Sequence, residues 1–249
     1  MLVALCAAAA PSLAAMSLAP VLVELGAGKN SELIAVTNDG DAPLRLQVEV
    51  SAWRQLPDGA TDLQPTQDVL VFPPLLTIVA HETRQLRVGT VAQAGASEKS
   101  YRLSVQELPA ENGAAPSGIT MLTKISIPVF IEPPQATTDG RIDAQTRADG
   151  SLGIRIVNTG TRRFVLSEVE AVGRDGSGAT LFDSKATGWY VLAGGERDYS
   201  LALSAADCRA THVIELRAKL DQRQIAASVP LTPAVCGRAA KTQISNAGS

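Results

Sequence analysis

Apolar and polar residues alternate along most of this chain, and a two-residue period is typical of β-strands that bury one face. In the first half the alternation predicts strands over residues 16–25, 32–37, 44–53, 69–72, 75–79, 83–88, 101–107 and 119–131. Polar or turn-forming stretches separate them, such as residues 38–40, 56–67 and 109–118. No stretch in this half has the spacing of an amphipathic helix, so we expect it to be all-β.

The segment Glu132-Pro133-Pro134 interrupts this pattern, because two prolines stiffen the chain and cannot donate to a sheet. Beyond it, strands are expected over residues 152–158, 164–172, 180–182, 198–203, 212–220 and 224–230. About seven short strands per half are typical of immunoglobulin-like β-sandwiches. We therefore expect two such domains, over residues 16–132 and 133–240, and a disordered tail over residues 241–249. A single large barrel is the alternative, which the Pro-Pro segment disfavours.

A short motif occurs once in each half. Residues 35–40 read Ala-Val-Thr-Asn-Asp-Gly, and residues 156–160 read Ile-Val-Asn-Thr-Gly. In both places β-branched residues run into Asn-x-Gly, and a strand follows within a few residues. Asn and Gly both tolerate the positive φ angles of tight turns. The repetition fits two sandwiches of one family.

Length and composition exclude several classes of protein. The 249 residues suit two domains of about 100 residues each, and 45% apolar against 19% charged residues favours a packed core. The net charge is −3 and the basic residues are scattered, so nucleic acid is not an expected partner. After residue 16 no apolar run is long enough to span a membrane.

The first 15 residues form an apolar run that ends in small residues around Ser12, Ala14 and Ala15. This is the pattern of a secretory signal peptide, although the usual basic start is missing; a short buried helix is the alternative. We expect export to the periplasm, with a mature chain that starts near Met16.

Of three cysteines, Cys6 would be removed with the signal peptide, which leaves Cys208 and Cys236 as an even pair in an oxidising compartment. If they oppose each other across an antiparallel hairpin, paired positions sum to 444 and the turn centres on Gln222, within a polar break. The sequence therefore predicts a disulfide that clamps the open end of a terminal hairpin. Zinc is the poorer interpretation, since two cysteines and two distant histidines have no zinc-site spacing.

Catalytic motifs are missing from the sequence. His81 and His212 have no visible partner set, and no nucleophile elbow, phosphate loop or metal-ligand cluster occurs. Carboxylate pairs such as Glu168 and Glu170 are more often charges on a solvated face. We expect a non-enzymatic protein with no cofactor, no metal and no small-molecule substrate.

Several segments together resemble the periplasmic pilus chaperones of the chaperone–usher pathway. The most specific is Tyr101-Arg102-Leu103-Ser104-Val105-Gln106-Glu107-Leu108-Pro109, which is similar to a Tyr-x-Leu-x-Val-x-Glu-Ile-Pro signature of that family. The others, in chain order, are residues 71–78 with their Pro-Pro break, residues 85–88, residues 119–130 and the hinge at residues 132–134. These segments cover the first domain, whereas the second resembles the family only in its strand pattern.

The resemblance implies an L-shaped pair of domains that binds pilus (fimbrial) subunits by donor-strand complementation and delivers them to an outer-membrane usher. A strand with an apolar face, preceded by a mobile loop, would enter the groove of an incomplete subunit. Ile119 and Met121 are the best-matched donor positions, and Leu122 or Ile125 joins them after a bulge. The free chaperone could self-associate through the same strand.

At one point this sequence departs from the best-known members of that family, which anchor the subunit's terminal carboxylate with two basic residues. Leu22 and Ser126 stand at the matching positions here. Lys124 shares a face with Ser126 and is one expected cation, and Arg87 is the candidate for the second. This departure, with the cysteine pair in the second domain, resembles the archaic or alternative branch of the pathway.

Two other functions fit the sequence less well. A surface adhesin or pilus component built from immunoglobulin-like domains should carry its own donor peptide near the mature N-terminus, whereas here a strand is expected to start directly at Met16. A β-sandwich hydrolase would need close carboxylates or a His-paired nucleophile in the cleft between the domains.

Overall fold

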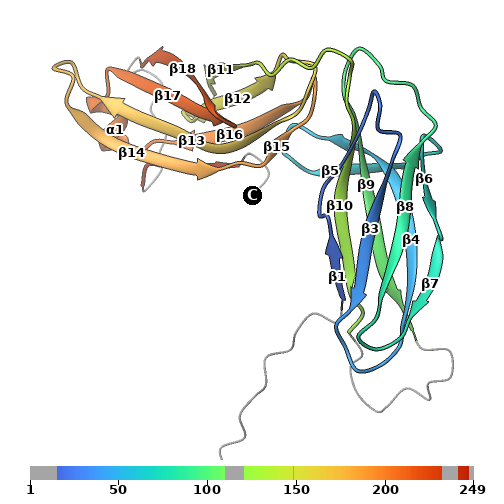
Figure 1. The fold of residues 1–249 in the computed structure, drawn as a ribbon. Helices are drawn as coiled ribbons and strands as arrows, with labels where there is room; N and C mark the ends of the chain where they lie inside the picture. Colours follow the sequence, from blue (N-terminus) through green and yellow to red (C-terminus); the bar gives the residue numbers. More distant parts are fainter. Residues whose placement is uncertain (1–15, 110–120, 148, 232–240, 247–249) are drawn as a thin grey trace, which may run out of the picture.

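The computed structural model describes residues 16–109, 121–147, 149–231 and 241–246. Two β-sandwiches lie at an angle to each other, and the L shape expected from the resemblance is confirmed (Figure 1). The predicted signal peptide, residues 1–15, lies outside the described residues. No helix in the described part of the chain is long and apolar enough to cross a membrane.

Domain 1, residues 16–131, packs two sheets face to face. One sheet has the order β1 (Met16–Ala19), β3 (Ser31–Asn38), β8 (Thr83–Thr90) and β6 (Val69–Phe72). The other has the order β2 (Val23–Leu25), β10 (Lys124–Ile131), β9 (Lys99–Leu108), β4 (Leu44–Gln55) and β5 (Thr61–Pro65), and β7 (Leu75–Ile78) also pairs with β4. Alternate residues of the strands other than β5 fill the core between the sheets, as a two-residue period requires.

The expected strand over residues 16–25 is two strands in two sheets. β1 pairs antiparallel with β3, and the chain then crosses at Pro20 so that β2 pairs parallel with β10. Proline cannot donate to a ladder, which explains why the first strand ends before it. The polar break expected over residues 56–67 was also wrong in part, because β5 lies within it and pairs with β4.

Domain 2, residues 140–246, is a second sandwich. One sheet has the order β11 (Gly140–Thr146), β12 (Leu152–Asn158), β16 (Glu196–Ala202) and β19 (Gln243–Asn246). The other has the order β14 (Thr180–Thr187), β13 (Phe164–Arg174), β17 (Val213–Leu220) and β18 (Arg223–Pro230), with β15 (Tyr190–Val191) beside β13. The short helix α1 (Ala205–Ala210) precedes β17.

Two expectations for domain 2 need correction. The tail predicted to be disordered contains β19, which pairs with β16 and buries Ile244 at 3% exposure in the core. The terminal hairpin is confirmed, but its paired positions sum to 443, as in Val213 with Pro230. Cys208 is not on a strand of that hairpin; it lies buried in α1 and is disulfide-bonded. Its expected partner, Cys236, lies outside the described residues.

Candidate functional site

One edge of β10 is only partly paired. Along its whole length β10 pairs with β9, but on its other side β2 pairs only with Val129–Ile131. Because β1 belongs to the opposite sheet, residues Lys124–Pro128 have no strand on the side away from β9 among the described residues. We call this stretch of backbone the open edge of β10.

The hydrogen-bond pattern shows which backbone groups face the open edge. The Glu107 N–H donates to the Thr123 carbonyl at 2.9 Å, so odd-numbered residues of β10 bond to β9. Even-numbered residues must then point their N–H and C=O groups the other way. The Glu132 N–H agrees, since it donates to the Leu25 carbonyl of β2 at 2.8 Å. Lys124 and Ser126 therefore present backbone groups to the open edge, whereas Pro128 presents a carbonyl but no N–H.

Side chains of β10 divide by the same parity. Ile125, Ile127, Val129 and Ile131 face the core of domain 1. Lys124, Ser126, Pro128 and Phe130 point to the other face of the sheet, which leads to domain 2.

The expected donor residues lie just before this strand. Met121 is 87% exposed and Leu122 is 43% exposed, whereas Ile125 packs against the core of its own domain. Ile119 lies outside the described residues. Met121 has the parity of the apolar face of β10, so an extension of the strand would carry that face beyond the domain's own core.

The two expected anchoring cations do not come together. Lys124 is exposed on the face of β10 that leads to domain 2. Arg87 lies on β8 in the other sheet, where its guanidinium donates to the Ser31 hydroxyl at 3.3 Å. Both side chains point away from the core, so the whole sandwich separates them. Leu22 packs against the cluster of Trp53, Phe130 and Leu192 between the domains.

A different cation lies on the sheet of Lys124. Arg102 is on β9 opposite Pro128, and its Nη2 donates to the Ser126 carbonyl at 3.2 Å. Its guanidinium stacks 5.0 Å from the ring of Trp53 and 5.5 Å from that of Trp189, which belongs to domain 2. Lys124 and Arg102 are four residues apart in register, about 13 Å along the strands. Sequence reasoning treated Arg102 as part of a signature and missed its place between the domains.

The surroundings of Arg102 are aromatic rather than acidic. Trp53, Phe130, Trp189 and Tyr190 form an aromatic cluster with ring centroids 5.4–6.1 Å apart. Among the described residues, no carboxylate lies within ion-pair distance of Arg102. Burial lowers the pKa of Arg102, with a smaller opposing effect of Tyr190. The positive charge of Arg102 is therefore stabilised mainly by contact with the faces of aromatic rings.

Ion pairs fix one side of the joint between the domains. Arg163 of domain 2 is buried and bonds to both Glu98 and Glu24 of domain 1, and its guanidinium stacks 3.6 Å from the ring of Phe130. Arg162 reaches Glu24 at 3.1 Å. Burial raises the pKa of Glu98 despite the charge and hydrogen bonds of Arg163. Burial would also raise the pKa of Glu24, but the two arginines outweigh it and hold that pKa below its usual value.

The β4–β5 hairpin fixes the other side of the joint. The Asp198 N–H of domain 2 donates to the Pro57 carbonyl at 2.7 Å, and the Gln55 side-chain amide donates to the Tyr190 carbonyl at 2.8 Å. Gly59 in the turn lies so close to Arg197 that a Cβ would be 2.8 Å from its guanidinium carbon. With contacts on both sides of the aromatic cluster, the two domains are held at a defined angle.

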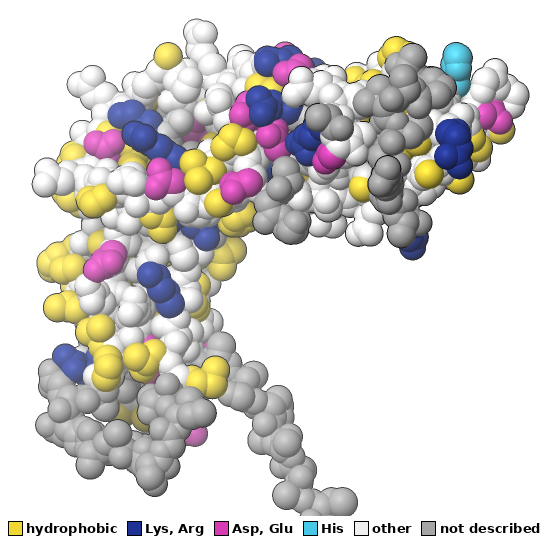
Figure 2. All heavy atoms as spheres, turned by 180° about the vertical axis from the view of Figure 1, so that it is seen from behind, with side chains coloured by type: hydrophobic (Ala, Val, Ile, Leu, Met, Phe, Trp, Pro, Cys, Tyr) yellow, Lys and Arg dark blue, Asp and Glu magenta, His cyan; other side chains and the backbone are white. Residues whose placement is uncertain are grey.

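The sheet of domain 1 formed by β1, β3, β8 and β6 carries exposed apolar side chains on its outer face. Arg87 lies opposite Leu33 on β3 and opposite Phe72 on β6, and those two are 44% and 73% exposed. Leu70 on β6 is 56% exposed. Figure 2 shows hydrophobic side chains along the side of domain 1 that faces away from domain 2. We call Leu33, Leu70 and Phe72, with Arg87 among them, the apolar stripe.

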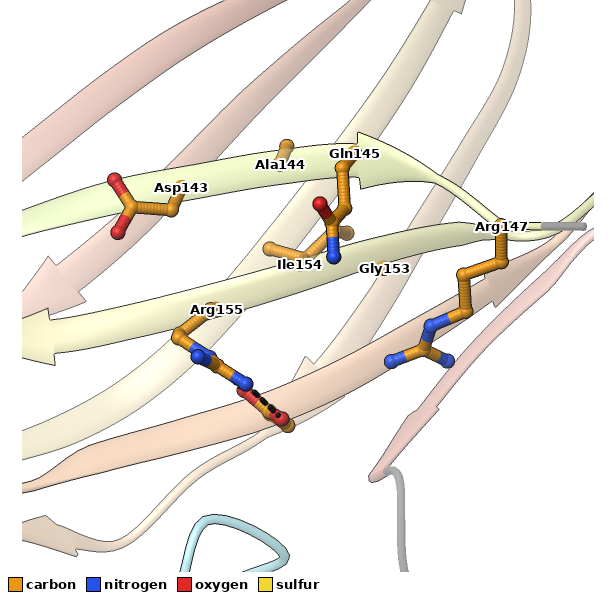
Figure 3. A pocket seen from close by; sticks show the side chains of 8 residues that line it. Asp143, Ala144, Gln145, Arg147, Gly153, Ile154 and Arg155 are labelled. Carbon is orange, nitrogen blue, oxygen red and sulfur yellow. Dashed lines mark hydrogen bonds and ion pairs between the residues drawn. The ribbon is translucent and has the colours of Figure 1, made fainter.

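A shallow hollow of about 260 Å³ lies on β11, β12 and β16 of domain 2, and the two carboxylates that line it, Asp143 and Asp198, are each paired with an arginine (Figure 3). In this hollow the Arg155 guanidinium donates to both carboxylate oxygens of Asp198, from Nε at 2.8 Å and from Nη2 at 3.0 Å. Arg147 lies across Gly153. No described group of three or more His, Cys, Asp or Glu side chains is placed to hold a metal ion. The open edge of β10, with Arg102 beside it, is therefore the best candidate site.

Comparisons with known proteins find a family match for domain 1, which contains the open edge of β10. Residues 15–137 match the family model described as pili and flagellar-assembly chaperone, PapD N-terminal domain. A search of the curated proteins gives no match.

Among solved structures, the chain is similar to one titled as the CsuC–CsuE chaperone–tip adhesion subunit pre-assembly complex from archaic chaperone–usher Csu pili of Acinetobacter baumannii. The identity is 18% and the TM-score 0.58, over 88% of this chain and 100% of that chain. It is also similar to a chain of the structure titled as the Salmonella enterica SafA pilin in complex with the SafB chaperone, with 17% identity and a TM-score of 0.56 over 88% of this chain and 99% of that chain. At these identities the likeness shows the fold, and the archaic branch stays a prediction.

Proposed function

Through its N-terminal domain the chain belongs to the pilus and flagellar-assembly chaperone family, and from this premise we propose that it is a periplasmic chaperone of pilus subunits. It binds a subunit at the open edge of β10 and delivers it to an outer-membrane usher. The observation that carries the proposal is that open edge, Lys124–Pro128, where β10 pairs with β9 on one side and has no described neighbour on the other.

The physical basis is strand addition. A subunit that lacks its last strand exposes core side chains and unpaired backbone groups, which favours aggregation. The outward N–H and C=O groups of Lys124 and Ser126 can pair with a strand at the edge of that gap. Ile119 and Met121 then fill pockets of the subunit, each contributing about 1.5–3 kcal/mol when buried. Ile125 remains in the core of its own domain and is the weakest of the donor candidates.

The carboxylate anchor is reassigned in this proposal. Lys124 keeps its role, and Arg102 replaces Arg87 as the second cation. Arg102 lies on the same sheet as the open edge and has no acidic partner among the described residues, so an incoming carboxylate would supply a counter-ion that this part of the chain does not.

We assign a second role to the apolar stripe. It lies on the sheet opposite the open edge, so a partner docked there does not compete with a bound subunit. Exposed Leu33, Leu70 and Phe72 around Arg87 are typical of a protein-binding surface, and the usher is the partner that a delivery chaperone must meet while loaded.

Co-purification tests strand donation. The chain is expressed in a bacterial periplasm with a tagged pilus subunit, and the chain recovered on the tag is measured. Met121→Asp and Ile119→Asp should each lower recovery about tenfold or more, because an apolar contact is replaced by a charge. Val91→Asp is the matched control: Val91 is 67% exposed at the end of β8, away from the site, and its change should leave recovery unaltered. Full recovery with Met121→Asp and Ile119→Asp would show that the donor assignment is wrong.

A further inference from the structure

Two side chains on one face of β16 carry buried hydrogen-bond donors that have no acceptor among the described residues. They are the Nε–H group of Arg197 and the hydroxyl of Tyr199. Residues two apart on a strand share a face, and Tyr199 lies in the core of domain 2 with no exposed surface. Arg197 therefore also points into the sandwich, at the end where the Pro57 carbonyl and Gly59 of domain 1 meet β16. Buried donors of this kind are rare in proteins, and a bound water or ion is the common explanation.

Arg197 also lacks an acidic partner, unlike Arg162 and Arg163 on the other side of the joint, which both bond to carboxylates of domain 1. Among the described residues Arg197 has no carboxylate within ion-pair distance, and its one side-chain hydrogen bond there runs from Nη2 to the neutral Oδ1 of Asn246 at 3.5 Å. With Gly59 packed against the guanidinium, part of this charge is held away from water without a counter-ion. Such an arrangement is unfavourable unless a negative group joins it.

A second buried tyrosine shows the contrast. Tyr101 of domain 1 is 2% exposed, and its hydroxyl donates to the Asp68 carboxylate at 2.6 Å. The ring centroid of Tyr199 instead lies 6.0 Å from the guanidinium carbon of Arg197. Burial raises the pKa of Tyr199, and the nearby charge of Arg197 opposes that rise. A guanidinium has donors only, so even if the Tyr199 oxygen accepted from it, the hydroxyl proton would still lack an acceptor. The group that satisfies both side chains must therefore be an acceptor.

From these contacts we infer that Arg197 and Tyr199 bind a single-atom anion of the chloride class. The anion accepts from the Arg197 Nε–H group and from the Tyr199 hydroxyl, and it supplies the negative charge that the described part of the chain does not place there. A spherical anion suits two buried donors on one strand face, whereas an oxyanion has several oxygens to satisfy. Because Arg197 also packs against Gly59 of domain 1, the bound anion stabilises the contact between the β4–β5 hairpin and domain 2. This inference does not depend on strand addition at β10.

Thermal unfolding in two salts tests the site, with sodium chloride as the probe and sodium gluconate at the same ionic strength as the reference. Gluconate is a bulky organic anion that cannot enter between the two donors. General salt effects act on every variant, so the quantity compared is the melting temperature in chloride minus that in gluconate. For the wild type this difference should exceed that of Tyr199→Phe and that of Arg197→Met by about 3 °C, once chloride reaches about ten times its dissociation constant.

Tyr101→Phe is the matched control, because it removes a buried hydroxyl that a carboxylate of the protein already satisfies. It should lower the melting temperature equally in both salts and keep the wild-type response to chloride. Tyr199→Phe should instead cost little in gluconate, since it removes an unsatisfied donor, and it should lose the response to chloride. This pattern distinguishes anion binding from a purely structural role of the hydroxyl.

Equal responses of the wild type and Tyr199→Phe to chloride would overturn the inference and would leave a buried water as the partner of these donors. A measurement on the wild type alone covers a variant that fails to fold. The Nε–H resonance of Arg197 should move with added chloride and reach a plateau, but stay fixed in gluconate. A resonance that does not respond to chloride overturns the inference as well.

Discussion

Asn38 and Asn158 make the same three hydrogen bonds in the two sandwiches. In each, the side-chain nitrogen donates to the carbonyl four residues ahead, Ala42 or Arg162, at 2.8 and 2.9 Å. It also donates at 3.0 Å to a carbonyl across the sandwich, that of Ile78 or Val191. The side-chain oxygen accepts from the glycine two residues ahead at 3.0 and 2.9 Å. Both asparagines are buried, so each domain is closed at one corner by the same device.

Removing this corner should destabilise the domain that contains it. Asn38→Ala removes the side-chain donor to the buried Ile78 carbonyl and to the part-buried Ala42 carbonyl, and we expect a loss of about 2–4 kcal/mol in the free energy of unfolding. Chemical denaturation measures it. Asn30→Ala changes an exposed asparagine and should stay within about 0.5 kcal/mol of the wild type. Equal effects of the two changes would contradict the structural role of Asn38.

The sequence already pointed to these corners, because a local motif and a two-residue period are enough to place strands and turns. Most expected strands are present, with β6 and β12 at their expected bounds. What failed depends on contacts between distant residues. β5 is polar and pairs only because β4 continues past the core, and β19 has a single buried side chain, Ile244, to mark it.

The candidate site was predictable in part for the same reason. Alternation along β10 placed Lys124 on one face and the isoleucines on the other. The second cation was not predictable, because Arg87 and Arg102 both alternate correctly on strands. Only the pairing order shows that β8 and β9 lie in different sheets, and only the angle between the domains brings Trp189 to Arg102.

Arg163 should be the most sensitive residue of the joint. Arg163→Met removes the closest ion pair of Glu98, whose side chain has no exposed surface, and leaves it a longer one to Arg162 at 3.9 Å and the backbone N–H of residue 163. We expect a loss of about 3–5 kcal/mol in the free energy of unfolding. Arg162→Met is the comparison, since its side chain is 37% exposed and its ion pairs should contribute about 1 kcal/mol or less. Denaturation curves of both variants measure the difference. Similar losses would mean that burial does not decide the strength of these pairs.

A comparison of two glycines can distinguish the effect of backbone strain from the effect of a contact between the domains. Gly59 and Gly28 have φ angles of +87° and +90°, so either change to alanine adds about 1–2 kcal/mol of strain. A Cβ at Gly28 meets nothing within 4 Å, whereas one at Gly59 meets Arg197 of domain 2. Gly59→Ala alone should therefore also displace the flexible guanidinium of Arg197, and it should lower the free energy of unfolding more than Gly28→Ala does. Chemical denaturation of the two variants measures the difference. Equal losses would show that the contact between residue 59 and Arg197 adds nothing to stability.

The joint should weaken in acid through Glu24. Its pKa is lowered in the folded protein, so its contribution is fully present above the pKa of the unfolded chain and is lost as the pH falls through the lower, folded value. Glu98 has a raised pKa and acts with the opposite sign. Glu24→Gln removes the first effect alone. Its melting temperature should lie below that of the wild type at neutral pH, and the gap should narrow below about pH 4.5. A gap independent of pH would contradict this sign.

The disulfide of Cys208 should stabilise domain 2. If Cys236 is its partner, the loss of the bond in Cys208→Ser should cost about 3–4 kcal/mol by the chain-entropy argument. Peptide mapping without reductant should recover the two cysteines in one linked peptide, and reductant should separate them. Two unlinked peptides would exclude this pairing.

The shortness of the open edge governs how long a bound strand stays. Its described part offers the backbone groups of Lys124 and Ser126 and one carbonyl of Pro128, each hydrogen bond adding only about 0.5–1.5 kcal/mol net. A contact of this size holds a partner through its side chains and its charge more than through its backbone. The dissociation rate, and with it the time available for transfer to another protein, is then set by a few side chains, which can change in evolution without altering the sheet.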